Sequence, residues 1–145
     1  TTLALTPDQP TGGTCAGCDR CIRACPTGAL QPDGSFDARK CISYLTIEHR
    51  GEIASAMAEK IGDRIFGCDT CVLVCPHQRA APSRANRKLA LRAEDMRLDL
   101  GEVLRLTRES FEERFGGSPI HRTGVEGLQR NARICFENTP KGTRE

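Results

Sequence analysis

Aromatic residues and long apolar runs are both scarce in this sequence. Its 145 residues include no Trp, one Tyr and five Phe, and hydrophobic residues make up 38% of the chain. A chain of this size and composition can build only a small apolar core, so we expect a second source of stability. No stretch approaches the roughly 18 consecutive apolar residues that a membrane-spanning helix needs. We therefore expect no membrane partner.

A secretory signal is also missing, because the first residues lack the basic, apolar and small-residue regions of a signal peptide. The chain begins Thr1-Thr2 without Met, which indicates a processed, cloned or truncated product. We expect a cytoplasmic protein, in which thiols stay reduced. For a chain with nine cysteines, metal ligation is then expected rather than disulfide formation.

The first group of cysteines has the spacing of bacterial ferredoxins. Cys15, Cys18, Cys21 and Cys25 follow one another with gaps of two, two and three residues, and Pro26 comes next. In two-cluster ferredoxins the first three cysteines of such a run hold one [4Fe–4S] cluster and the fourth holds the other. The run therefore predicts two clusters.

The second group has the same ending but lacks one ligand. Cys68, Cys71 and Cys75 precede Pro76, while Ile65 stands where a further Cys is expected. Cys41 can supply the missing corner. The crossed ferredoxin arrangement assigns four cysteines to each cluster: cluster 1 takes Cys15, Cys18, Cys21 and Cys75, and cluster 2 takes Cys25, Cys41, Cys68 and Cys71.

Structural zinc is the alternative for these cysteines, because CxxC spacings also suit a tetrahedral zinc site. Two Cys-Pro endings and eight interleaved thiols favour iron–sulfur clusters instead. Since every ligand position of both clusters is filled, the clusters are expected to carry electrons rather than to bind substrate. We expect the ninth cysteine, Cys135, to be a buried inert thiol on a helix face.

The charge is uneven along the chain. Residues 1–78 contain 7 basic and 9 acidic residues, whereas residues 79–145 contain 14 and 10. Of the 21 basic residues, 17 are Arg, which suits bidentate phosphate contacts. The basic second half could bind nucleic acid, although its interleaved acidic residues also fit an ordinary solvated helix surface.

The expected fold class is α+β and mostly helical, with a bacterial two-cluster ferredoxin-like module followed by a short all-helical tail. We expect an extended segment over 1–14, the two-cluster module over 15–82 and a basic tail over 83–145. The module contains a helical insertion over 42–62, which Gly62 is expected to cap.

Two local patterns add detail to this outline. The turn sequence Pro32-Asp33-Gly34 predicts a small hairpin within 29–36. Amphipathic periodicity predicts three helices in the tail, at 84–92, 99–115 and 124–137.

The cysteine segments together resemble the iron–sulfur, C-terminal portion of epoxyqueuosine reductase, a cobalamin-dependent oxidoreductase of queuosine biosynthesis. The resemblance rests on CAGCDRCIRACPTG at 15–28, DARKCISYLTIE at 37–48, RIFGCDTCVLVCP at 64–76 and Arg130-Asn131-Ala132. It covers about residues 12–138. The stretches around Cys41 and Cys68 are more particular to that family than the first run.

This resemblance implies electron transfer through two [4Fe–4S] clusters to a cobalamin that reduces epoxyqueuosine to queuosine in tRNA. It implies cobalamin contacts at Ser43, Tyr44 and Asp69. It also implies tRNA contacts near the anticodon, through Arg122, Arg130 and Asn131. An external electron donor and a cobalamin-binding catalytic domain or subunit complete the implied partners.

The family's cobalamin-binding domain precedes its cysteine region, and residues 1–14 cannot form such a domain. We therefore expect the chain alone to hold clusters but not to turn over substrate, with no catalytic residue of its own. A free-standing two-cluster ferredoxin, or an electron-transfer subunit of another oxidoreductase, is the alternative function. A third possibility is a nucleic-acid-binding module in which the clusters only stabilise the fold.

Overall fold

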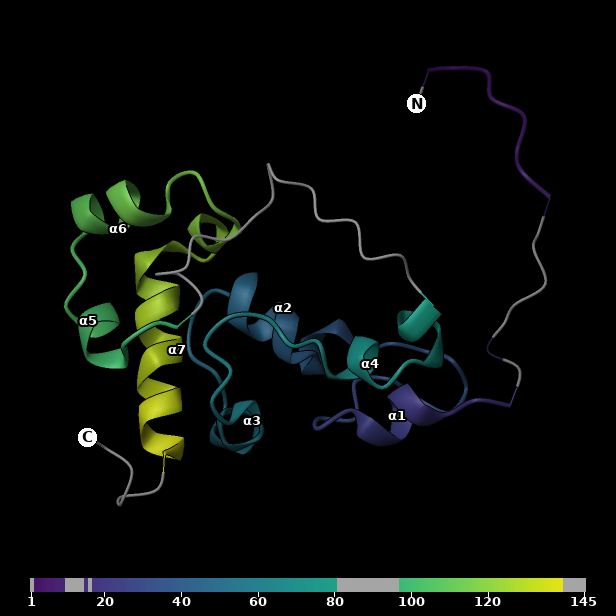
Figure 1. The fold of residues 1–145 in the computed structure, drawn as a ribbon, viewed down its shortest axis with the longest axis horizontal. Coiled ribbons are helices and arrows are strands. Elements are labelled where there is room, and N and C mark those ends of the chain that lie inside the picture. The colour runs from purple at the N-terminus through teal and green to yellow at the C-terminus, as the bar shows by residue number, and fades with distance from the viewer. Residues whose placement is uncertain (1, 10–14, 16, 81–96, 140–145) are drawn as a thin grey trace.

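The described part of the chain is mostly helical. The computed structural model describes residues 2–9, 15, 17–80 and 97–139, and Figure 1 shows their arrangement. The helices of the cysteine half are α1 (Arg20–Ala24), η1 (Ala38–Lys40), α2 (Ile42–Ile47), α3 (Ser55–Ile61), α4 (Thr70–Leu73) and η2 (Pro76–Ala80). Those of the C-terminal half are α5 (Leu100–Leu104), α6 (Arg108–Phe115), η5 (Pro119–Thr123) and α7 (Gly124–Asn138).

The predicted hairpin is reduced to a single antiparallel bridge. Leu30 pairs with Phe36, and no strand is formed among the residues that the structure describes. The turn between them has the expected chemistry, because Gly34 has a φ of 83° and the Asp33 carboxylate accepts a hydrogen bond from the Ser35 amide. The pieces on either side are too short for a ladder, so the structure supports only the helical part of the predicted class.

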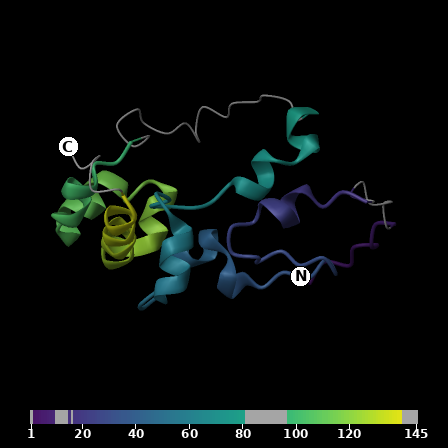
Figure 2. The same cartoon turned by 90° about the horizontal axis from the view of Figure 1, so that it is seen from below.

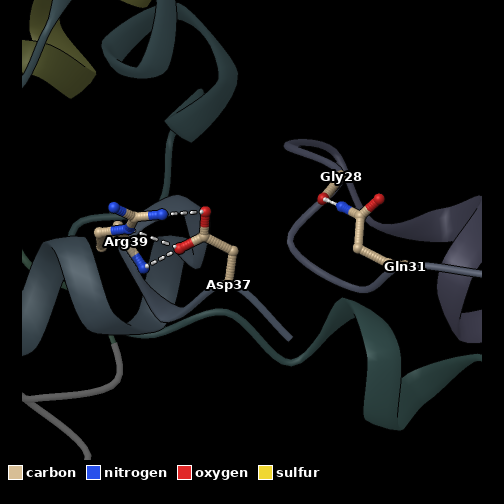
Figure 3. Close-up of polar contacts among 4 residues, drawn as sticks. All are labelled: Gly28, Gln31, Asp37 and Arg39. Atoms are coloured by element: carbon tan, nitrogen blue, oxygen red, sulfur yellow. Dashed lines mark hydrogen bonds and ion pairs between the residues drawn. The ribbon is translucent and has the colours of Figure 1, made fainter. Parts of the chain in front are cut away.

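Side-chain hydrogen bonds hold the chain just before and just after this turn (Figure 3). The Gln31 amide donates a hydrogen bond to the Gly28 carbonyl. The Asp37 carboxylate accepts from the Arg39 backbone at 3.1 Å and pairs with the Arg39 guanidinium at 2.9 Å, which begins η1. The segment that leads to Cys41 therefore has a defined local structure.

The predicted helical insertion consists of two helices, α2 and α3. The chain leaves α2 through Gly51, whose φ is 98°, and re-enters a helix at Ser55. Gly62 ends α3 with a φ of 65°, which confirms the expected cap. The insertion thus carries the chain away from Cys41 and back toward Cys68.

The C-terminal half holds the main apolar core. The buried residues of this core come from α5, α6, η5 and α7: Val103, Phe111, Phe115, Ile120, Leu128 and Ala132. The predicted helix 99–115 is divided, because Thr107 begins α6 with a reciprocal capping box to Ser110. The predicted helix 124–137 corresponds closely to α7, and the predicted helix 84–92 lies outside the described residues.

The long helix α7 connects this core to the cysteine half. It packs against α5 on one side and against α2 and α3 on another. Figures 1 and 2 show α2 between α7 and the paired helices α1 and α4. A second apolar cluster, formed by Ile42, Ile61 and Ile134, lies where α7 packs against α2 and α3.

No helix in the described part of the chain is both long and apolar enough to cross a membrane.

Candidate metal centre

The two cysteine runs come together through the short helices that they contain. Cys21 lies in α1 and Cys71 in α4, and these two helices pack against each other (Figures 1 and 2). All nine cysteines are free thiols. The eight predicted ligands are exposed or half-buried, whereas Cys135 is buried. The fold therefore gathers two thiol-rich loops at one end of the molecule.

Cys41 lies close to the second run, as the predicted ligand set requires. Burial raises the pKa of the Cys71 thiol, and the neighbouring Cys68 and Cys41 thiols raise it further by their charge. Such mutual effects arise between ionisable groups at short range. Three of the four cysteines assigned to cluster 2 are thus electrostatic neighbours.

Cys25, the fourth cysteine assigned to cluster 2, is prepared for the thiolate state. The Ala29 backbone N–H donates to its Sγ atom at 3.3 Å, and the Thr27 hydroxyl lies 3.6 Å from the same atom. Burial acts to raise the pKa of Cys25, but these hydrogen bonds and those from the Leu30 and Thr27 backbones lower it to about 7. The thiolate is the form that binds iron.

The donor set suits iron–sulfur clusters. Within the described ranges, no three His, Cys, Asp or Glu side chains are close enough to hold one metal ion together. A cubane has a different requirement, because each of its four thiolates binds a different iron atom. Seven free thiols on the two packed runs, together with Cys41 and with hydrogen-bond donors directed at Cys25 Sγ, fit two such clusters.

The three predicted cobalamin contacts lie at accessible positions beside the second run and Cys41. Ser43 and Tyr44 are in α2 directly after Cys41, and the Tyr44 side chain is exposed. Asp69 is exposed at the start of α4, next to Cys68. The ring of Tyr44 lies 6.4 Å from that of His49.

Two of the predicted nucleic-acid contacts, Arg130 and Asn131, make hydrogen bonds within the fold. Asn131 is fully buried, and its amide nitrogen donates to the carbonyls of Thr46 at 2.7 Å and Ile65 at 2.9 Å. Arg130 is also buried and makes five hydrogen bonds: to Asn131 Oδ1 twice and to the carbonyls of Leu45, His49 and Gly51. Both side chains thus bond to backbone carbonyls of α2 and of the loops before Cys68 and after α2. Arg130 also lines an open groove beside Arg122, and contact with nucleic acid stays a prediction for both residues.

Thr46 is a supporting residue that the sequence pattern did not single out. Its hydroxyl donates to the Ile42 carbonyl at 2.8 Å and accepts from the Gly67 backbone N–H at 3.0 Å. Ile42 follows Cys41 and Gly67 precedes Cys68, so Thr46 joins the two ligand-bearing segments. Its spacing of four residues from Ile42 on a buried helix face was the only sequence signal.

Arg122, the remaining predicted nucleic-acid contact, is exposed. It forms an ion pair of 2.7 Å with Glu48 and lies beside an open groove of about 470 Å³ between the α2–α3 loop and the start of α7. Arg50 and Arg133 also line this groove. Two of the predicted contacts, Arg122 and Arg130, therefore lie along this groove, which Glu52 and Glu126 line as well.

Comparison with known families places these observations in context. Residues 14–78, which include all eight predicted ligands, match the family described as the 4Fe-4S double cluster binding domain. The chain is 42% identical over 139 residues to an epoxyqueuosine reductase from Francisella cf. novicida, an alignment that covers 95% of this chain and 38% of the relative.

Solved structures give the same result. Epoxyqueuosine reductase from Bacillus subtilis matches with a TM-score of 0.82 at 35% identity, over 92% of this chain and 36% of that one. A structure of epoxyqueuosine reductase with an epoxyqueuosine-modified tRNA-Tyr stem loop also matches with a TM-score of 0.82, at 35% identity, over 92% of this chain and 35% of that one. The chain thus spans little more than a third of the length of these relatives. Over nearly all of its own length it corresponds to the iron–sulfur, C-terminal portion of the epoxyqueuosine reductases.

Proposed function

We propose that the chain carries two [4Fe–4S] clusters in the crossed ferredoxin-like arrangement and relays electrons through them. The observation that carries this proposal is the packing of α1 against α4, with Cys41 brought into electrostatic contact with Cys68 and Cys71. Cluster 1 is held by Cys15, Cys18, Cys21 and Cys75. Cluster 2 is held by Cys25, Cys41, Cys68 and Cys71.

The relay ends at a cobalamin bound partly by this chain and partly by a catalytic domain or subunit. A bound cobalamin would supply the reduced cobalt needed for removal of the epoxide oxygen. Ser43, Tyr44 and Asp69 are the candidate contacts of this chain, because they are accessible and adjoin the ligands Cys41 and Cys68. Their role is to bind and orient the cofactor beside cluster 2.

The substrate of the complete system is epoxyqueuosine in the anticodon region of a tRNA. Support comes from the relatives, of which one was solved with an epoxyqueuosine-modified tRNA stem loop. On this chain we assign the nucleic-acid surface to Arg122 and to its groove neighbours Arg50 and Arg133. A tRNA partner would place the reaction in the cytoplasm.

We further propose that different segments of the chain have different functions. The module at 15–82 carries the clusters, and the tail at 83–145 both supports that module and offers the basic surface, while 1–14 leads into the module. A free-standing two-cluster ferredoxin is the second candidate, favoured by the complete set of thiol ligands for each cluster.

A tRNA titration distinguishes these functions. We expect the cluster-loaded chain to bind a tRNA-Tyr anticodon stem loop weakly and with strong salt dependence, since the contacts are mainly to phosphates. Replacing both Arg122 and Arg133 with Ala should weaken binding by about tenfold, whereas the control Arg23→Ala on α1 should not. A tRNA affinity that changes neither with salt concentration nor with the double substitution would favour the free-standing ferredoxin.

Turnover is tested in the same preparation. With added cobalamin and a strong reductant, the chain alone should not convert epoxyqueuosine, and conversion should appear when the cobalamin-binding portion of a relative is supplied. Turnover by the chain alone would contradict the proposed partner.

A further inference from the structure

Two threonine hydroxyls lie against cysteine sulfur atoms in matching positions. The Thr27 hydroxyl oxygen is 3.6 Å from Cys25 Sγ, and the Thr70 hydroxyl oxygen is 3.4 Å from Cys68 Sγ. In each pair the threonine comes two residues after the cysteine. A thiolate bound to iron has no proton to donate, so in the loaded protein the hydroxyl is the donor in both contacts.

The surroundings of these contacts keep them in place. Thr27 is buried, and Thr70 is half-buried in the first turn of α4. Cys25 receives an additional hydrogen bond from the Ala29 backbone N–H at 3.3 Å. Both sulfur atoms are therefore stabilised by donors that the fold holds in position.

Both contacts fall on the same predicted cluster. Cys25 and Cys68 are ligands of cluster 2 in the crossed arrangement. No cysteine assigned to cluster 1 has a hydroxyl residue two positions later, because those positions hold Gly17, Arg20, Arg23 and His77. In the described part of the chain, a threonine contact of this kind is therefore seen only at ligands assigned to cluster 2.

Hydrogen bonds to ligand sulfur change a cluster's reduction potential. The one-electron reduction of a [4Fe–4S] centre adds a negative charge that its thiolates share, so a donor at sulfur stabilises the reduced form and raises the potential. Burial acts in the opposite direction, since a less hydrated site disfavours added charge. All four ligands of cluster 2 are half-buried, whereas Cys15 and Cys18 of cluster 1 are exposed.

We propose that Thr27 and Thr70 are positioning residues that raise the reduction potential of cluster 2 by donating hydrogen bonds to the thiolates of Cys25 and Cys68. Their effect offsets the burial of that cluster and keeps it able to accept an electron from a donor. This inference rests on the proposed cluster assignment, but it concerns residues that bind no metal themselves.

The test is a redox titration of the anaerobic, cluster-loaded chain with dithionite, followed by electron paramagnetic resonance. Thr27→Val and Thr70→Val each remove one hydroxyl while keeping the side-chain shape. Each should move the midpoint of one cluster to a more negative potential and leave the other cluster unmoved. A tenfold change in the redox equilibrium corresponds to about 59 mV for a one-electron couple, and the double variant should shift further than either single one.

Two controls separate this effect from damage to the site. Thr27→Ser and Thr70→Ser retain a hydroxyl and should keep the original midpoint. In deuterated water, electron–nuclear double resonance should detect exchangeable deuterons near the reduced cluster. The double Val variant should lose the two hydroxyl deuterons and keep the one on the Ala29 backbone N–H.

The possible failures are distinguishable. If iron content and both cluster signals are normal but the midpoints do not move, or if both midpoints move equally, the inference on Thr27 and Thr70 is wrong. If the parent chain shows no pair of [4Fe–4S] signals, the proposed function itself is wrong.

Discussion

At the scale of single residues, Arg130 is the one charged residue that is buried in the described part of the chain. Its guanidinium has five N–H donors, and all five are used on the Asn131 amide oxygen and on carbonyls of the α2 end and the following turn. Burial lowers the pKa of Arg130, and the charge of Glu52 partly opposes this effect. A cation so placed stabilises the fold only while every donor is satisfied.

Arg130→Lys should therefore destabilise the protein although it retains the charge. An ammonium group has three donors and cannot reach the same acceptors, so at least two of the five hydrogen bonds are lost. We expect the thermal midpoint of the loaded chain to fall by about 5–15 °C. The matched control is Arg133→Ala on the exposed side of α7, which should change the midpoint by less than about 3 °C. Equal effects would show that Arg130 is not a structural residue.

The burial of Cys135 can be tested through the pH dependence of the protein's stability. Burial raises the pKa of its thiol to about 11, from 9.0 in an unperturbed thiol, and the charge of Asp63 contributes. Because the folded-state pKa is the higher one, the stability gained by burying the neutral thiol is present below pH 9 and is lost as the pH approaches 11.

In the loaded chain at pH 8, iodoacetamide should leave Cys135 unmodified, as measured by mass spectrometry, and should modify it rapidly after unfolding. Cys135→Ala should remove the corresponding part of the fall in thermal midpoint between pH 9 and 11. Alkylation of the native protein at the unfolded rate would contradict the buried position.

The helical pattern of α7 predicted the burial of some of these residues but not of others. Cys135 was expected to be buried on a helix face and is buried, but Arg130, which was expected as a tRNA contact, is buried as well. A periodicity argument assumes one buried face, whereas α7 packs against α5 on one side and α2 on another. Such a contact between distant segments cannot be read from local sequence.

At the scale of elements, α7 and Thr46 together fix the distance between the two segments that supply Cys41 and Cys68. Asn131 bonds to the Thr46 and Ile65 carbonyls, and the Thr46 hydroxyl bonds to the Gly67 N–H. The C-terminal tail is thus part of the framework of the predicted cluster 2 site. From its charge pattern alone, the tail was expected to be either a nucleic-acid-binding surface or a solvated helix surface.

Thr46→Val should weaken cluster 2 selectively. The substitution keeps the shape of the side chain but leaves the Gly67 N–H without its acceptor, at a cost of about 1–3 kcal/mol. We expect iron in the purified protein to fall from about eight toward about four per chain. Thr46→Ser, which keeps the hydroxyl, should retain most of the iron. Equal loss in both variants would point to packing rather than to the hydrogen bond.

Element boundaries were predictable where a capping residue marks them. Gly62 was identified as the end of α3, because a glycine with positive φ commonly terminates a helix. The break between α5 and α6 was missed, since apolar periodicity continues through Leu104 and Leu106 while Thr107 begins a new helix. The Leu30–Phe36 pairing was expected as a hairpin and is a single bridge, because each flanking piece is very short.

At the scale of the whole molecule, the apolar core is distributed unequally. The larger cluster is built from residues in α5, α6, η5 and α7, whereas the loops around the cysteines contribute few buried apolar side chains. The low hydrophobic content predicted that metal binding must support the fold. Because buried apolar side chains are few in the loops around the cysteines, we expect that dependence to lie in the cysteine half, which composition alone could not indicate.

Removal of the clusters should therefore unfold the chain unevenly. Because cluster-binding free energy becomes folding free energy where no other core exists, we expect rapid hydrogen exchange over 15–41 and 65–80 in the apo protein. The amides in the middle of α7 should keep part of their protection. Uniform protection throughout the apo chain would show that the cysteine half folds without metal, and uniform loss would show that the C-terminal core also depends on it.

The central claim is that eight cysteines hold two [4Fe–4S] clusters, and metal analysis with Mössbauer spectroscopy of the anaerobically purified chain tests it most directly. The account predicts about eight iron and eight sulfide per chain. It also predicts that Cys41→Ser lowers both to about four, while Cys135→Ser changes neither. Stoichiometric zinc in place of iron, or a Cys41→Ser protein that keeps both clusters, would contradict it.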